Sequence, residues 1–195
     1  MLALHSCEPV SSGGQILEEP FDDNKLGWIE ENTGSHYLDI ANGYYRMLSR
    51  DSSARRSSSG SLTGSYLVNL PKEYSIESSI KLIESKDEKG HFGIILLGAS
   101  IEYTISIYSS GWILFTEYDY NLDSIYTMNS KYIEPNDNSI SDIKLDIDLS
   151  SYELEINNVK VGEGEFKMEP RYWRDLRFYT STESAIAIDY LKIKK

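Results

Sequence analysis

The chain has 195 residues, a formal net charge of −12 and a pI of about 4.7. Because a polyanion repels nucleic acids and anionic membranes, we expect neither as a partner. The single cysteine, Cys7, excludes an internal disulfide framework and a cluster of thiolate metal ligands. Hydrophobic residues make up 40% of the chain, as in a folded globular domain, and no run of about 20 apolar residues predicts a membrane span.

Residues 1–19 are rich in serine and glycine, and we expect them to form a flexible leader before a single domain at 20–195. Within the leader, Leu4 to Cys7 resembles the end of a bacterial lipoprotein signal, in which the cysteine is lipidated. The residues before Cys7 are too few for the apolar run of about 7–15 residues that a secretory signal needs. Two interpretations stay open: a lipid-anchored protein of the cell envelope whose start codon lies further upstream, or a cytoplasmic protein with an incidental thiol.

Short segments of alternating apolar and polar residues follow one another from residue 20, with turn signals about every ten residues. Asn42-Gly43, a strong tight-turn dipeptide, predicts a hairpin between 36–42 and 44–50. We expect a polar loop at 52–60 and a central strand at 91–98, which is apolar on both faces. The other expected strands cover residues 62–70, 74–83, 101–109, 112–120, 124–133, 143–149, 152–156, 175–182 and 185–193.

The segment 143–156 carries its carboxylates at alternate positions. One face of its first expected strand comprises Ile143, Leu145, Ile147 and Leu149. Asp146 and Asp148 lie on the opposite face, because successive side chains of a strand alternate. Ser150-Ser151 is expected to turn the chain into the next strand. We therefore expect these carboxylates to keep one side of a sheet in water.

Strands that are apolar on one face must pack on another sheet, and two such sheets lie about 10 Å apart. The sequence therefore predicts an all-β fold, an antiparallel β-sandwich of two sheets. Jelly-roll connectivity suits this length better than the immunoglobulin pattern, which needs only about 100 residues. The prediction fails if Ile143, Leu145 and Ile147 are exposed while Asp146 and Asp148 line an enclosed cleft.

Several stretches together resemble the concanavalin A-like lectin/glucanase superfamily, in particular its bacterial laminin G-like and 3-keto-disaccharide-hydrolase-like domains. The resemblance covers about residues 20–195 and implies a two-sheet jelly roll with one concave face, a frequent place for sugar or protein contacts. It implies no particular ligand. The stretches are FDDNKLGW, NGYYRM, YSIESSIKLI, GHFGIILLG, YTISIYSSGWILF, IKLDIDLSSYELEINNVKV and IAIDYLKI.

Glycoside hydrolases of this superfamily carry a Glu-x-Asp-x-Glu or Glu-x-Asp-x-x-Glu run on one strand, and no stretch of this chain matches it. Asp146 and Asp148 are about 6.6–6.8 Å apart along a strand, but nothing in the sequence encloses an acid there. No catalytic residue is therefore predicted. No cofactor is predicted either, although 134–139 could hold a structural calcium ion, with an ordinary turn as the simpler interpretation.

Aromatic residues give the best functional signal. Trp112, Tyr118 and Tyr120 fall on one face of their expected strand, and Tyr108 faces the same way on the preceding strand. Sugars stack on aromatic rings and need polar groups nearby for their hydroxyls. The polar residues expected on the same side are Glu102, Thr104, Ser106 and Thr116. The alternative is that these rings only cover the edge of the sheet.

Arg171 and Trp173, in the segment 169–175, form a second candidate ligand site because loops often carry function. The alternative is that Trp173 caps one end of the sandwich.

The sequence favours a non-catalytic module that binds glycan or protein surfaces. A carbohydrate-active hydrolase with a non-standard carboxylate pair is the first alternative. An acidic protein-interaction or immunity-type protein that binds a basic partner is the second.

Overall fold

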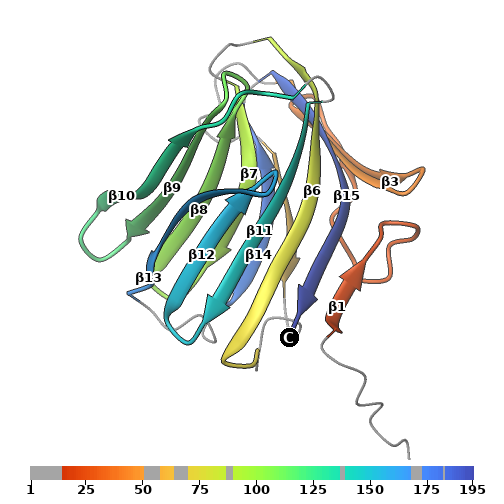
Figure 1. Ribbon diagram of the computed structural model, residues 1–195. Coiled ribbons are helices and arrows are strands. Elements are labelled where there is room, and N and C mark those ends of the chain that lie inside the picture. Colours follow the sequence, from red (N-terminus) through yellow and green to blue (C-terminus); the bar gives the residue numbers. More distant parts are fainter. Residues whose placement is uncertain are drawn as a thin grey trace, which may run out of the picture.

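The computed structural model describes residues 15–50, 58–63, 70–86, 90–136, 139–167, 173–181 and 183–195 (Figure 1). Within these ranges every element is a β-strand. The described residues accordingly include no helix with the length and hydrophobicity that crossing a membrane would require. Cys7 and Arg171 lie outside the described residues, and so does most of the expected strand at 62–70.

The strands are β1 (Gln15–Glu19), β2 (Glu31–Asn32), β3 (His36–Ala41), β4 (Tyr44–Ser49), β5 (Ser58–Thr63), β6 (Glu73–Ser85), β7 (His91–Leu97), β8 (Ile101–Tyr108), β9 (Trp112–Asp119), β10 (Ser124–Tyr132), β11 (Ile140–Asp148), β12 (Ser151–Ile156), β13 (Val159–Glu165), β14 (Asp175–Thr180) and β15 (Ser184–Lys194).

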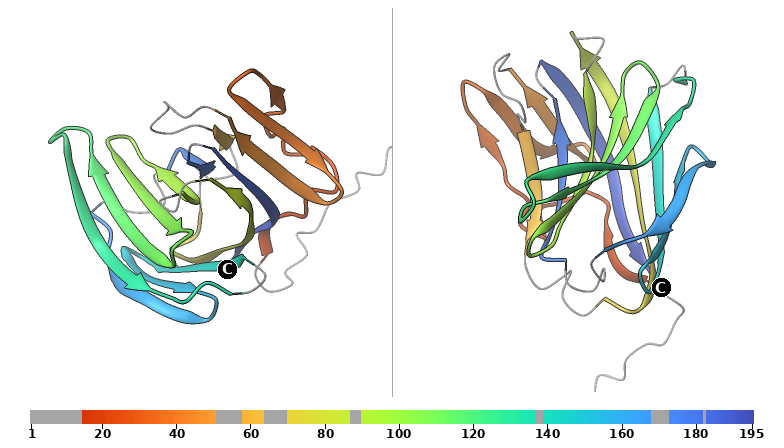
Figure 2. Two further views of the ribbon diagram at one scale, coloured as in Figure 1. Left: turned by 90° about the horizontal axis from the view of Figure 1, so that it is seen from above. Right: turned by 90° about the vertical axis from the view of Figure 1, so that its left-hand side faces the viewer.

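Two antiparallel sheets make up the described part of the chain, and Figure 2 shows them as two layers. The large sheet has the order β13-β12-β11-β6-β15-β4-β3-β2, with β1 paired to β15. The small sheet has the order β10-β9-β8-β7-β14-β5. The fold is therefore the two-sheet antiparallel sandwich that the alternating pattern predicts. We call the face of each sheet that is turned away from the other sheet its outer face.

The core lies between the sheets and is built from alternate residues of each strand. Ile143, Leu145 and Ile147 of β11 are buried in it, as predicted, and they face residues such as Tyr103 and Phe115 of the small sheet. Burial of apolar surface contributes about 25 cal/mol per Å², so this shared layer is the main source of stability.

Asparagine and glycine set the tight turns. Asn42 and Gly43 have φ values of 56° and 75°, the pair of positive angles that a type I′ hairpin turn between β3 and β4 requires. The turn between β11 and β12 lies one residue earlier than predicted. Leu149, which the alternating pattern placed in the core, has a φ of 56° and an exposed side chain in that turn.

Two further segments differ from the prediction. Residues 15–19, which the sequence assigned to the leader, form β1 and pair with β15, so they belong to the sandwich. Residues 58–60, expected in a polar loop, open strand β5, which pairs with β14. Serine and glycine have a low strand propensity, so only pairing with β14 makes this segment extended.

Candidate functional site

The outer face of the small sheet brings together residues from four neighbouring strands. The pairing registers place Tyr118, Glu102, Leu97 and Asp175 in one row across β9, β8, β7 and β14. The next row contains Thr116, Thr104, Ile95 and Arg177, and the one after it Leu114, Ser106, Gly93 and Tyr179. Four of the six residues predicted to bind a ligand lie on or beside this face: Tyr108, Trp112, Tyr118 and Tyr120.

Tyr118 and Tyr120 form a fixed aromatic corner at the end of β9. Their ring centroids are 4.8 Å apart and the rings are nearly perpendicular. The Tyr118 hydroxyl donates a hydrogen bond to Asp123, and the Tyr120 hydroxyl donates one to Glu102 Oε2 at 2.7 Å. Tyr120 is nevertheless 50% exposed, so this corner offers an accessible aromatic surface whose orientation is set in advance.

Trp112 offers a second aromatic surface at the other end of β9. Its side chain is 50% exposed and meets the ring of Tyr132 on β10 edge to face, at 5.8 Å. Trp112 and Tyr118 are six residue steps apart on the extended strand, a span of about 20 Å. The two aromatic surfaces therefore bracket the polar middle rows of the face.

Tyr108 is held against His91 rather than standing free. The two rings stack at 4.9 Å, and His91 also meets Tyr179 of β14 edge to face. The Tyr179 hydroxyl crosses β7 and donates a hydrogen bond to Ser106 Oγ at 2.6 Å. Ser106, which we expected to be open to a ligand, is therefore buried and already engaged.

Gly93 of β7 lies beneath this crossing and close to the backbone of β8. A Cβ atom at this position would lie 1.9 Å from the carbonyl oxygen of Ile105 and 3.5 Å from the Tyr179 ring. The position therefore requires glycine because any side chain would collide with the β8 backbone, whereas the Tyr179 ring alone would leave room for a Cβ atom.

Two carboxylates of the same face are almost fully buried. Glu102 is 2% exposed, and its oxygens accept hydrogen bonds from the hydroxyls of Tyr120 and Thr104. Asp175 is 5% exposed, and its Oδ2 accepts a hydrogen bond from Arg177 Nε at 2.5 Å. Burial raises the pKa of Asp175, and this effect outweighs the opposing influence of Arg177 and of the Leu176 backbone. Asp175 Oδ1 is buried without a hydrogen-bond partner among the described residues.

Trp173 does not belong to the candidate site. It is 1% exposed and packs in the core against Phe166, Tyr103 and Tyr74, at centroid distances of 5.4, 6.4 and 6.5 Å. A ring enclosed in this way cannot stack on a ligand. The prediction of Trp173 as a binding residue is corrected in favour of a structural role.

The outer face of the large sheet carries acids in a different setting. Asp146 is 39% exposed and pairs with Lys144 at 2.5 Å, and Asp148 is exposed beside it. Lys160 pairs with two further acids, Glu153 and Glu163. The four acids border an open depression of about 820 Å³ rather than an enclosed cleft. The prediction that Asp146 and Asp148 face water is confirmed.

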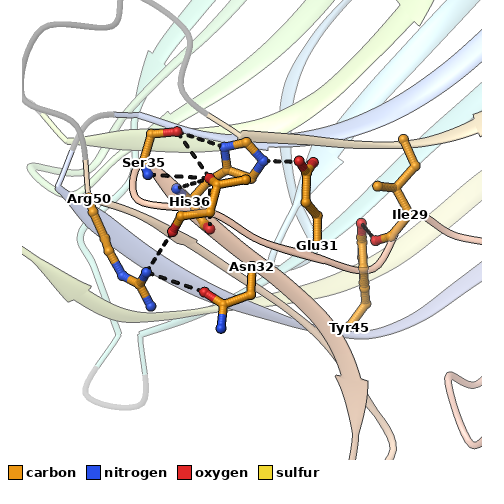
Figure 3. Close-up of polar contacts among 8 residues, drawn as sticks. Ile29, Glu31, Asn32, Ser35, His36, Tyr45 and Arg50 are labelled. Atoms are coloured by element: carbon orange, nitrogen blue, oxygen red, sulfur yellow. Dashed lines mark hydrogen bonds and ion pairs between the residues drawn. The ribbon is translucent and has the colours of Figure 1, made fainter.

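A polar cluster at β2 and β3 serves the chain itself (Figure 3). Glu31 pairs with His36 at 2.9 Å, and Arg50 donates a hydrogen bond to the carbonyl oxygen of Thr33 at 2.8 Å. The Tyr45 hydroxyl reaches the carbonyl oxygen of Ile29. These contacts join the segment around β2 to β3, to β4 and to Arg50 after β4, so the cluster holds the short edge strand β2 in place.

A metal site finds no support among the described residues, where no group of three or more histidine, cysteine, aspartate or glutamate side chains could hold an ion. The segment 134–139, considered for calcium, lies partly outside these residues. In its described part the Asn136 side chain accepts a hydrogen bond from Ile140 N and donates one to its carbonyl oxygen. This arrangement is that of an ordinary polar turn.

The fold is the jelly-roll sandwich of concanavalin A-like proteins, as the resemblance in the sequence implied. No family model matches the chain, and no curated protein matches its sequence. Among solved structures it is similar to an endo-β-1,3-glucanase from Pyrococcus furiosus, with a TM-score of 0.68 and 12% identity over 93% of this chain and 94% of that one.

Two other solved structures have the same fold. The carbohydrate-binding module CBM66 from Bacillus subtilis matches with a TM-score of 0.51 and 11% identity, over 86% of this chain and 91% of that one. The receptor-binding domain of botulinum neurotoxin type G matches with a TM-score of 0.59 and 13% identity, over 93% of this chain and 47% of that one. The chain therefore spans about half the length of the neurotoxin domain.

Proposed function

We propose that the chain is a glycan-binding module that holds its ligand on the outer face of the small sheet, between the Tyr118–Tyr120 corner and Trp112. The observation that carries this proposal is the pair of exposed, fixed aromatic surfaces at the two ends of β9. Apolar faces of sugar rings stack on such surfaces, and the fixed orientation lowers the entropic cost of binding.

The rows between the aromatic surfaces supply polar partners. Thr104, Thr116 and Arg177 are half-buried, and they lie in a single row across β8, β9 and β14. Hydroxyl groups both donate and accept hydrogen bonds, whereas the guanidinium group donates only. A sugar chain along this face would therefore meet aromatic rings at its ends and hydrogen-bonding groups between them.

The similar structures support the same choice of ligand class. The glucanase and CBM66 are named for carbohydrates, and both share this architecture at low sequence identity. Binding by stacking needs no reacting group, which agrees with the non-catalytic module that the sequence favoured.

Calorimetric titration with soluble glycans tests the proposal, using β-1,3-glucan, mixed-linkage glucan, fructan and mucin O-glycans. We expect at least one to bind, and Trp112→Ala and Tyr120→Ala each to weaken that affinity about tenfold, or about 1.4 kcal/mol. Tyr44→Ala is the matched control, because Tyr44 is an exposed tyrosine on the large sheet. Equal losses in all three variants would contradict a site on the small sheet.

A protein surface is the second candidate ligand. Leu122 and Ile125, beside the aromatic corner, are 61% and 68% exposed, and exposed aliphatic side chains suit a protein partner better than a sugar. The glycan panel separates the two candidates, because a protein-binding face would leave every glycan unbound.

A further inference from the structure

We infer that the outer face of the large sheet holds a second ligand site, in which Lys81 and Arg46 bind the carboxylate group of an acidic sugar such as a uronic acid. This site lies on the opposite sheet from the aromatic surfaces of Trp112, Tyr118 and Tyr120. It goes beyond the proposed function and does not depend on it, because the two sites share no residue.

A small residue between two long ones creates a hollow on this face. Strand pairing places Arg46, Ala187 and Lys81 in one row across β4, β15 and β6. The Ala187 side chain is a single methyl group, so the sheet is recessed between the two cations. The recess belongs to an open depression of about 750 Å³ that all three residues line. Small-molecule sites typically measure about 300–1,000 Å³, so this depression has room for one or two sugar rings.

The lining of this depression is basic, although the whole chain has a formal net charge of −12. Among the described residues that line it, Arg46 and Lys81 are charged, and none is an aspartate or glutamate. The depression beside Asp146 and Asp148 on the same sheet contains more acids than lysines. A locally basic hollow attracts a small anion, whereas the acidic surface around it repels a long polyanion. The ligand that fits is therefore a short sugar with few carboxylates.

The two cations have different roles. Arg46 donates hydrogen bonds from Nε and Nη2 to the two oxygens of Asp39, which fixes the orientation of the guanidinium group. A guanidinium group has five N–H donors, so three remain for a ligand. The charge of Arg46 is balanced by Asp39, whereas Lys81 is exposed and has no ion pair among the described residues. Lys81 therefore supplies the net positive charge of the site.

The rim of the depression suits a sugar ring attached to the carboxylate. Tyr44 and Ile83 border it and are 40% and 56% exposed, so they offer an aromatic and an aliphatic surface to the apolar face of a sugar. Asn42 and Ser139 also border it, and their side chains can donate and accept hydrogen bonds with sugar hydroxyls. The depression is open, so it does not enclose a long acyl chain.

Calorimetric titration of the full chain with three acidic disaccharides, built from galacturonate, glucuronate or mannuronate, tests the site. Their methyl esters are the reference ligands, because they keep the sugar rings and lose the charge. We expect at least one acid to bind, and its ester to bind about tenfold more weakly. Lys81→Met should weaken binding of the acid about tenfold and leave binding of the ester unchanged. If no acid binds, or if acid and ester bind equally, the inference is wrong.

Lys72→Met is the matched control, because Lys72 is an exposed lysine just before β6 and outside the depression, and affinity should change by less than about twofold. Ala187→Leu fills the hollow without changing the charge and should weaken binding at least about tenfold, with thermal melting to verify the fold of each variant. Equal losses in Lys81→Met and Lys72→Met, or full affinity in Ala187→Leu, would place the acid elsewhere. Competition by equimolar acetate would show that the sugar ring is not recognised. Neutral glucans lack the carboxylate, so Tyr44→Ala remains a control for them.

Discussion

The outer faces of the two sheets both carry acids, yet the acids are in opposite environments. On the large sheet Asp146 and Glu153 lie in solvent and pair with lysines. On the small sheet Glu102 and Asp175 are buried and hydrogen-bonded by hydroxyl and guanidinium groups. The alternation of side chains along a strand determines on which face a carboxylate lies. The neighbouring side chains on that face determine whether the carboxylate is exposed to solvent.

The difference matters for function because the two environments have different energetic costs. An exposed ion pair contributes about 0–1 kcal/mol and its removal is tolerated. Burying a carboxylate is unfavourable unless hydrogen bonds or a cation stabilise it. Buried carboxylates with shifted pKa values therefore occur most often at functional sites. The contrast between the two faces leads to four expected outcomes.

The strongest test concerns the backbone beneath the small sheet's outer face. Gly93→Ala places a methyl group against the Ile105 carbonyl oxygen, and we expect a loss of about 3 kcal/mol or more in the free energy of unfolding. Gly34→Ala is the control, because a Cβ atom there has no neighbour within 4 Å. Urea denaturation measures both. A tolerated alanine at 93 would contradict the close approach of the β7 and β8 backbones at this position.

Removing one acid from each face tests burial directly. Glu102→Ala leaves the hydroxyls of Tyr120 and Thr104 without their acceptor, so the free energy of unfolding should fall by about 1–3 kcal/mol. Asp146→Ala removes only a half-exposed pair with Lys144 and should cost less than about 0.5 kcal/mol. Equal costs in chemical denaturation would erase the distinction between the faces.

The pH dependence of stability should differ between the faces as well. The pKa of Asp175 is raised above 3.8 in the folded state, so this group stabilises the fold at low pH and the contribution is lost as the pH rises through the raised pKa. The stability of the wild type relative to Asp175→Asn should therefore decline from about pH 4 upward. Melting temperatures measured between pH 3 and pH 7 check the slope, with Asp148→Asn as the comparison; a rising difference would contradict the assignment.

Salt should affect the large sheet most. Lys160 bridges Glu153 and Glu163 in solvent, so Lys160→Met should lower the melting temperature slightly at low salt and not at all near 1 M. Arg177→Met removes the cation that pairs with the buried Asp175 and should therefore destabilise the fold at both salt concentrations. An effect of Lys160→Met that persists at 1 M salt would mean that its pairs are not screened.

Much of the sandwich can be predicted from sequence because strand alternation is a local property with a period of two residues. The buried face of β11, the solvent position of Asp146 and Asp148, and the Asn42-Gly43 hairpin all follow from nearest neighbours. The placement of Trp112 and Tyr118 on the same face of β9 follows in the same way, since it requires no knowledge of the partner strands.

The placement of Glu102 and Asp175 in one row across the small sheet could not be predicted from the local sequence pattern. It exists because β14 pairs with β7 rather than with a neighbour in the sequence, and no local pattern encodes which distant strand closes a sheet. The burial of Trp173 and the use of Ser106 by Tyr179 depend on the same pairing. Local alternation is enough to predict two layers and the side that each residue takes. Which side chains meet across strands depends on packing over the whole sheet, so it is known only from the three-dimensional structure.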